Sequence, residues 1–281
     1  MRYRVGLIVP SSNTTIEIEV PALLAAHSRV CPVDTFSFHG SRARMQQVGA
    51  EELRAMNDQM SRCALELGDA RPDILASACL VAVMAQGRGY HRVAEAEITE
   101  IARRQSLEVP VISSAGALVN ALAALGARRV AMVAPYMESL TALVVDYLEG
   151  EGIAVADRVS LCVDDNVAVG RLDPADLQEH WKRLDLAGCD ALVLSACVQM
   201  PSLPAVEPVE QAAGLPVVTA ATATAWSILD ALGLAPVAPG GGHLLGGTVA
   251  ATPVVAAPSL AASEVRTPAE SSEHWQPASG H

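Results

Sequence analysis

The sequence predicts an α/β fold built from two similar halves with parallel sheets, and three observations support this. Apolar, strand-like runs alternate with segments of helical spacing, a pattern typical of parallel strands joined by right-handed crossovers. The chain of 281 residues is 51% hydrophobic but only 3% aromatic, so its core must consist of small aliphatic side chains that let helices pack closely on a sheet. The succession of strands and helices restarts near the middle of the chain, which indicates two pseudosymmetric, Rossmann-like halves with a cleft between them.

The first half is expected over residues 1–115. It opens with a strand at residues 4–9, followed by a polar turn at residues 10–15 that offers several helix-capping side chains. Ser113 and Ser114 are placed to cap the last helix of this half, which we expect to cross over to the second half. The other predicted elements are strands at 33–38, 74–76 and 109–112, and helices at 16–27, 49–67, 90–105 and 115–125.

The second half is expected over residues 116–239. Its first strand, at residues 129–133, runs into Ala134-Pro135-Tyr136, much as the first strand of the chain runs into Val9-Pro10-Ser11. Asp173 and Pro174 give a helix its cap and first residue. The other predicted elements are strands at 153–161, 191–194 and 215–218, and helices at 138–150, 173–186, 206–213 and 222–232. From Gly240 to His281 glycine runs replace any periodicity and charge is sparse, so we expect a disordered tail over 240–281.

Composition narrows the range of possible partners. The formal net charge of −12 argues against nucleic acid or an anionic membrane as a partner. Pro10 ends the first apolar run too early for a signal segment or a membrane span. The six cysteines contain no Cys-x-x-Cys pair and do not cluster with histidines, so a zinc site is disfavoured. We therefore expect a cytoplasmic protein with free thiols that acts on a small molecule.

Two of the cysteines, Cys79 and Cys197, occur in the same local pattern. Each follows the residues Ser-Ala at the end of an apolar run, and each run is introduced by an aspartate, Asp73 or Asp190. Ligands of parallel sheets bind at the carboxyl ends of the strands. The N–H groups and dipole of a helix that follows such a strand favour a thiolate. We therefore expect one reactive thiol from each half to face a shared cleft.

Paired thiols can perform several kinds of chemistry. They can move a proton between the two faces of a carbon, as in racemisation, or combine a nucleophilic thiolate with a proton-donating thiol. A redox disulfide is less favoured without Cys-x-x-Cys spacing, and the residues alone do not rank the first two possibilities. Asn13, Tyr136 and Asn166 lie at comparable strand ends. Neutral amide and phenol groups there suit recognition of a carboxylate together with backbone N–H donors.

The combination of motifs resembles one known family. The segments 9–13, 77–80, 134–136, 165–166 and 195–202 together resemble the maleate cis–trans isomerases of the aspartate/glutamate racemase superfamily, over about residues 4–234. Glutamate racemases usually have Asn-Thr and Thr-His after their two cysteines, where this chain has Leu80-Val81 and Val198-Gln199. Arylmalonate decarboxylases keep only the second cysteine, so Cys79 sets this chain apart from them.

The resemblance implies a mechanism that needs no metal, flavin or nucleotide cofactor. Cys79 would add to an alkene carbon of maleate, giving a succinyl-cysteine-like intermediate whose single bond can rotate before fumarate leaves. Cys197 would supply and later remove a proton at the neighbouring carbon. The implied substrate-binding residues are Asn13, Tyr136 and Asn166, which would hold the carboxylates, and Leu80, Val81 and Val198 beside the thiols, where backbone N–H groups help. A homodimer is also implied.

Two other functions remain open at this point. A two-cysteine racemase or epimerase, acting on an amino acid or a hydantoin, would use the same thiols as acid and base without a covalent bond. A small-carboxylate binding protein would keep the cysteines only as core residues.

Overall fold

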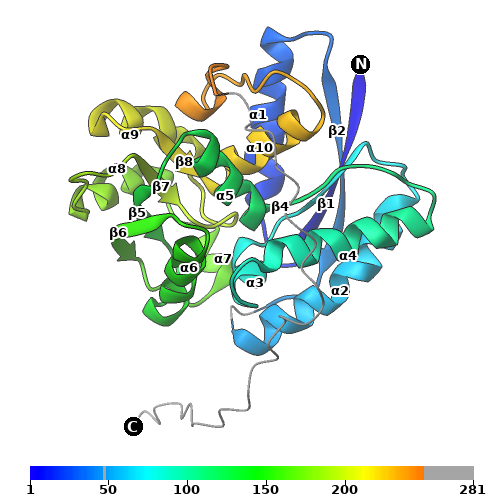
Figure 1. Ribbon diagram of the computed structural model, residues 1–281, viewed down its shortest axis with the longest axis horizontal. Coiled ribbons are helices and arrows are strands. Elements are labelled where there is room, and N and C mark those ends of the chain that lie inside the picture. Colours follow the sequence, from blue (N-terminus) through cyan, green and yellow to red (C-terminus); the bar gives the residue numbers. More distant parts are fainter. Residues whose placement is uncertain (47–48, 250–281) are drawn as a thin grey trace. The chain divides into compact units, whose positions relative to one another are not determined.

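The computed structural model describes residues 1–46 and 49–249, which contain two four-stranded parallel sheets with the same strand order (Figure 1). The order is β2-β1-β3-β4 in the first sheet and β6-β5-β7-β8 in the second. The strands are β1 (Arg2–Pro10), β2 (Thr35–Ala43), β3 (Ile74–Ser77), β4 (Val111–Ser113), β5 (Arg129–Ala134), β6 (Ala154–Ser160), β7 (Ala191–Ser195) and β8 (Val217–Thr219). The predicted α/β fold with an internal repeat is therefore confirmed.

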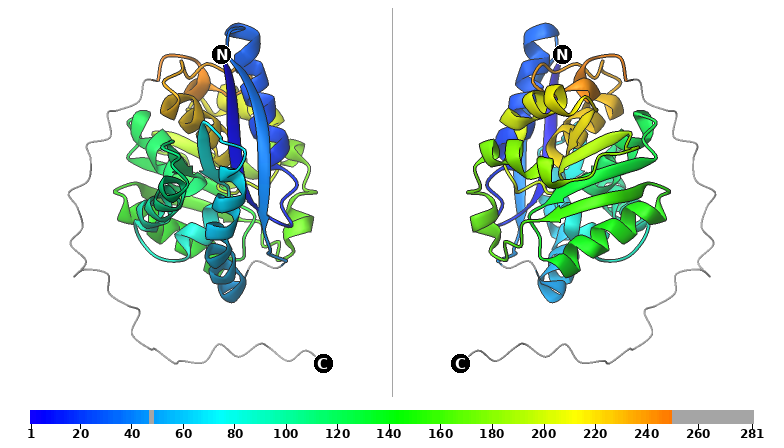
Figure 2. Two further views of the ribbon diagram at one scale, coloured as in Figure 1. Left: turned by 90° about the vertical axis from the view of Figure 1, so that its right-hand side faces the viewer. Right: turned by 90° about the vertical axis from the view of Figure 1, so that its left-hand side faces the viewer.

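Helices connect the strands of both sheets, and the further views in Figure 2 show them packed around the strands. In the first half they are α1 (Ile16–Val30), α2 (Ala50–Gly68), α3 (Leu80–Met84), α4 (Tyr90–Arg104) and α5 (Ser114–Ala124). In the second half they are α6 (Glu138–Gly150), α7 (Asn166–Val169), η1 (Pro174–Asp176), α8 (Leu177–His180), η2 (Trp181–Arg183), η3 (Leu203–Ala205), α9 (Val206–Ala213), α10 (Ala220–Ala231) and η4 (His243–Leu245).

Two predicted elements need correction. The second strand continues to Ala43, beyond the predicted end at residue 38, because β2 stays in register with β1 along its whole length. Its half-exposed edge position admits polar residues that hide the strand pattern. The helix predicted at 173–186 is wrong, because this segment forms the short turns η1, α8 and η2. Leu177 is the only buried residue in these three turns, so no apolar face holds a longer helix in place.

The two halves meet through their last helices. Ser113 and Thr219 occupy equivalent strand ends and cap α5 and α10, accepting hydrogen bonds from the N–H groups of Gly116 and Thr222. The two helices pack against each other, and Thr224 Oγ1 donates to Ser114 Oγ at 3.2 Å. Small residues along both helices allow this close contact.

The predicted start of the disordered tail, at residue 240, lies too early in the chain. Residues 240–249 are ordered, with Leu244 and Leu245 of η4 buried and with the Ala238 N–H donating to the carbonyl of Leu245. The two leucines supply apolar anchors that offset the flexibility of the surrounding glycines. Residues 250–281 lie outside the described part of the chain. Within that part, no helix is both long enough and apolar enough to cross a membrane.

Candidate active site

The two repeated cysteines occupy equivalent places in the two sheets. Cys79 lies two residues after the end of β3 and directly before α3, and Cys197 lies two residues after the end of β7. Both side chains are buried, with 3% and 5% of their surfaces exposed. The two thiols interact electrostatically with each other and with the phenol of Tyr136. The structure thus brings together three of the residues that the sequence singled out.

Burial disfavours the ionised form of both thiols. It raises the pKa of Cys79 to about 12, against the opposing effect of a hydrogen bond from the Ala82 N–H. Burial also raises the pKa of Cys197, although the Tyr136 hydroxyl and backbone N–H groups such as that of Gln199 work against it. The N–H donors near the two thiols lower their pKa values, in the direction expected from the sequence, but burial raises them by more. Loss of hydration outweighs the local N–H donors.

This shift makes protein stability depend on pH. Below the ordinary Cys79 pKa of 9.0, folded and unfolded chains both hold the thiol proton, so the contribution to stability is complete. Above it the unfolded chain releases the proton while the folded chain keeps it, and stability falls by about 1.4 kcal/mol per pH unit for each such thiol. Thermal unfolding followed from pH 7 to pH 10 should show a steeper decline in the wild type than in Cys79→Ala. Parallel declines would contradict a raised thiol pKa.

Tyr136 links the two strand ends of the second half. It lies in the turn after β5, is buried, and its hydroxyl donates to the Ala196 carbonyl at 3.1 Å. The same hydroxyl is within hydrogen-bonding reach of Cys197. Because a phenol has a single proton, it can give that proton either to the carbonyl or to an ionised sulfur. Tyr136 is therefore placed to stabilise negative charge on Cys197 or on a ligand beside it.

The oxygen and the nitrogen of the Asn13 side chain form different hydrogen bonds, and these determine how the amide is oriented. Its Oδ1 accepts hydrogen bonds from the N–H groups of Thr15 and Ile16, both at 3.0 Å, and so caps the start of α1. Its Nδ2 donates only a long hydrogen bond, 3.4 Å, to the carbonyl of Val198. The Oδ1 oxygen thus stabilises the start of α1, and the Nδ2 nitrogen remains available to donate to a bound carboxylate.

This division predicts the effect of Asn13→Asp. The carboxylate keeps the cap of α1, because both of its oxygens accept hydrogen bonds, but it replaces the amide donor with a negative charge. The unfolding temperature should change little, whereas kcat/KM for an anionic substrate should fall by about 100-fold or more. Steady-state kinetics and thermal unfolding of the same preparation check this. Loss of stability with unchanged kcat/KM would show that Asn13 serves only the fold.

Asn166 approaches the same turn from the second half. It is the first residue of α7, whose start is capped by Asp165, and it is buried. Its Nδ2 donates to Ser12 Oγ at 2.7 Å. The two amides, one from each half, therefore meet at the turn that follows β1.

The remaining predicted residues border the two thiols. Leu80 and Val81 are the first residues of α3, so their N–H groups lack carbonyl partners within the helix. Val198 follows Cys197, and all three side chains are buried. No group of three or more His, Cys, Asp or Glu side chains in residues 1–46 and 49–249 could hold a metal ion.

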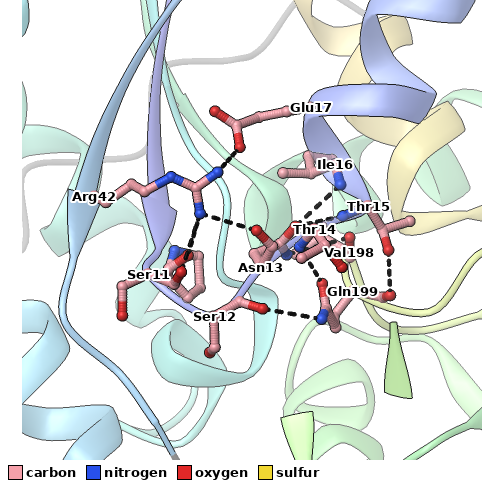
Figure 3. A network of polar contacts seen from close by, with 11 residues as sticks. Ser11, Ser12, Asn13, Thr14, Thr15, Ile16, Glu17, Arg42, Val198 and Gln199 are labelled. Atoms are coloured by element: carbon pink, nitrogen blue, oxygen red, sulfur yellow. Dashed lines mark hydrogen bonds and ion pairs between the residues drawn. The ribbon is translucent and has the colours of Figure 1, made fainter. Parts of the chain in front are cut away.

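The sequence alone did not single out three residues of this region as functional candidates. Gln199 hydrogen-bonds with the turn that carries Asn13, and Arg42 donates to backbone carbonyls of that turn while pairing with Glu17 (Figure 3). Glu19 is a buried carboxylate that accepts from the N–H and Oγ of Ser202 and from the N–H of Leu203. The signal for Gln199 was available, since it is a polar residue within an otherwise apolar stretch directly after Cys197.

Each of the two parallel sheets presents one cysteine at an equivalent strand end. The protein is therefore an α/β protein of two similar halves whose candidate active site contains a pair of thiols. The family model described as arylmalonate decarboxylase matches residues 5–245. A maleate isomerase of Pseudomonas putida is 54% identical over 245 residues, which make up 87% of this chain and 98% of the relative. This chain belongs to the family that the model describes and, by its identity to such relatives over nearly their whole length, to the maleate isomerases.

Solved structures agree with this assignment. The maleate isomerase Iso from Pseudomonas putida S16, as a cysteine-to-alanine variant with maleate, gives a TM-score of 0.87 at 50% identity, covering 88% of this chain and 99% of that chain. A Nocardia farcinica maleate cis–trans isomerase, as a cysteine-to-serine mutant with a covalently bound succinylcysteine intermediate, gives a TM-score of 0.84 at 49% identity. That match covers 87% of this chain and 98% of the other.

Proposed function

We propose that this protein is an isomerase that converts maleate to fumarate without a cofactor, through a covalent succinyl-cysteine-like intermediate. The observation that carries the proposal is the pairing of two buried thiols beside uncharged hydrogen-bond donors. Its maleate isomerase relatives, one of them solved with a succinylcysteine intermediate, support the same chemistry.

In this mechanism Cys79 is the nucleophile. The Cys79 thiol first releases its proton to water. The resulting thiolate forms a C–S bond to one alkene carbon of maleate, and the π electrons move toward the carboxylate on the neighbouring carbon. Cys197 then gives its proton to that neighbouring carbon, which leaves a C–C single bond free to rotate. After rotation the Cys197 thiolate takes a proton back, the C–S bond breaks, and fumarate leaves with the Cys79 thiolate regenerated.

Hydrogen-bond donors around the thiols complete the proposed site. Asn13, Tyr136 and Asn166 hold the two carboxylates, and backbone N–H groups at Leu80, Val81 and Val198 add further donors. These uncharged groups attract the dianion through the N–H and O–H donors that they present to it, despite the net charge of −12. Donors aimed at the carboxylate stabilise the charge that builds up as the thiolate adds.

Incubation of the purified, chelator-dialysed protein with maleate, followed by chromatography for fumarate, tests this function. Accumulation of fumarate under reducing conditions without any added cofactor is expected. No conversion of maleate would sink the proposal. Exchange of the α-proton of aspartate, glutamate or a hydantoin in its place would indicate a racemase.

The organisation of the enzyme is part of the proposal. Residues 1–115 and 116–239 act as the two halves that enclose the substrate, and the protein works as a homodimer in the cytoplasm. The six free cysteines suit a reducing compartment. Light scattering of the purified protein tests the dimer.

A further inference from the structure

Both the oxygen and the nitrogen of the Gln199 side chain form hydrogen bonds within the fold. Gln199 is only 2% exposed. Its Oε1 accepts from the Thr14 N–H at 2.8 Å, and its Nε2 donates to the carbonyls of Asn166, at 2.7 Å, and Ser12, at 3.2 Å. Figure 3 shows the contacts with Ser12 and Thr14. A flipped amide would set its nitrogen against an N–H and its oxygen against two carbonyls, so these contacts determine its orientation.

These contacts join three separate turns of the chain. Ser12 and Thr14 flank Asn13 in the turn after β1, and Asn166 lies at the start of α7 in the second half. Gln199 itself belongs to the turn after β7, where its own N–H donates to Cys197 Sγ at 3.4 Å. One side chain therefore connects both candidate carboxylate-binding amides with the turn that carries the second thiol.

A second hydrogen bond holds the main chain of Gln199 on the same turn. Thr15 Oγ1 donates to the Gln199 carbonyl at 2.7 Å, so both the backbone and the side chain of this residue contact the segment around Asn13. The side chain of Gln199 therefore adds to an existing connection rather than providing the only one. Its removal should shift the turns relative to one another without separating them.

We propose that Gln199 is a positioning residue for the isomerisation, a role that rests on the proposed function. Its carboxamide holds Asn13, Asn166 and Cys197 at the mutual distances that a dicarboxylate requires. A misplacement of about 1 Å between catalytic groups can cost about 100-fold in rate. The carboxamide also satisfies three backbone groups, the Thr14 N–H and the carbonyls of Ser12 and Asn166.

Gly170, directly after α7, provides an independent way to disturb this connection. A Cβ atom at this position would lie 2.5 Å from Nε2 of Gln199 and 2.6 Å from Oγ1 of Thr14. The neighbouring Gln199 is held by three hydrogen bonds and cannot simply rotate away. Gly170→Ala should therefore displace the carboxamide while leaving residue 199 itself unchanged.

Kinetics of Gln199→Met test the proposal, with Gln105→Met as the matched control. Gln105 also donates through Nε2 to a backbone carbonyl, that of Leu65 at 3.0 Å, but it lies between α2 and α4 rather than in the site. We expect kcat/KM for maleate to fall about 100-fold in Gln199→Met and to stay at the wild-type value in Gln105→Met. Gly170→Ala should lower kcat/KM in the same direction.

Gln199→Glu adds a readout that a purely structural residue would not move. A carboxylate can accept from the Thr14 N–H but cannot donate to Ser12 or Asn166, whereas a protonated carboxyl group recovers one donor. The kcat/KM of this variant, divided by that of the wild type at each pH, should therefore rise as the pH falls. Wild-type kcat/KM in Gln199→Met and Gly170→Ala, with only a lowered unfolding temperature, would overturn the proposal.

A failure of the proposed function can be distinguished from a failure of the proposed role of Gln199. If the wild type does not convert maleate, the proposed function is wrong. The role of Gln199 in holding the turn after β7 can still be tested by alkylation of Cys197 with N-ethylmaleimide, followed by peptide mass spectrometry. Faster alkylation in Gln199→Met than in the wild type and in Gln105→Met would support the role of Gln199 in holding this turn. Equal rates in all three proteins would overturn it.

Discussion

Replacing Cys79 with alanine is expected to lower kcat/KM for maleate by on the order of 10⁴-fold or more, since the variant loses the atom that forms the covalent bond in the proposed mechanism. Cys79 lies directly before α3 and is almost completely buried. The substitution removes one sulfur and leaves Asn13, Tyr136 and Asn166 unchanged. Maleate should therefore still bind, which calorimetry can measure.

The matched control for this variant is Cys189→Ala. Cys189 is also buried, but its thiol interacts with charges around Arg129 and Asp185 rather than with the paired cysteines. The control should keep wild-type turnover. Substantial activity in Cys79→Ala would contradict the covalent mechanism, whereas inactivity together with lost binding and a lowered unfolding temperature would indicate damage to the fold.

The second large effect is expected for Cys197→Ser. Serine is a much weaker acid than cysteine, so proton transfer to and from the neighbouring carbon slows, with an expected loss of about 10²–10⁴-fold in kcat. The covalent adduct on Cys79 should then accumulate, because water can supply the proton that completes it, whereas its release needs a base and the serine hydroxyl is a poor one. Peptide mass spectrometry after incubation with maleate should show Cys79 heavier by the mass of one maleic acid.

Cys189→Ser is the control for the same substitution elsewhere, and it should neither slow turnover nor trap an adduct. A Cys197→Ser variant with wild-type kcat would remove Cys197 from the mechanism. An adduct on a cysteine other than Cys79 would reverse the assignment of the nucleophile. The relative from Nocardia farcinica that holds a succinylcysteine in a cysteine-to-serine mutant makes such trapping a reasonable expectation.

Much of the fold could be predicted because the chain repeats itself. The alternation of strands and helices is strong where strands are fully buried, as in β3 and β7, and weak where one edge is exposed, as in β2. Cys79 and Cys197 stood out because the same small residues precede both. Their burial and interaction follow from the equivalent places of β3 and β7 in the two sheets.

Other features depend on tertiary context that a single sequence does not display. The raised pKa of Cys79 follows from burial, which here exceeds the effect of the N–H donors that the local sequence suggests. The partners of Gln199 come from residues more than 30 positions away in the chain, so no local pattern could reveal them. The ordered segment at 240–249 depends on contacts of Leu244 and Leu245 with the folded core.

The measurement that tests the central claim most directly is a proton NMR time course of the purified protein with maleate in D₂O under reducing conditions. In the wild type we expect the olefinic signal of maleate to decline as the signal of fumarate appears. Both signals should stay unchanged in Cys79→Ala. An unchanged maleate signal in the folded wild-type protein would contradict the account.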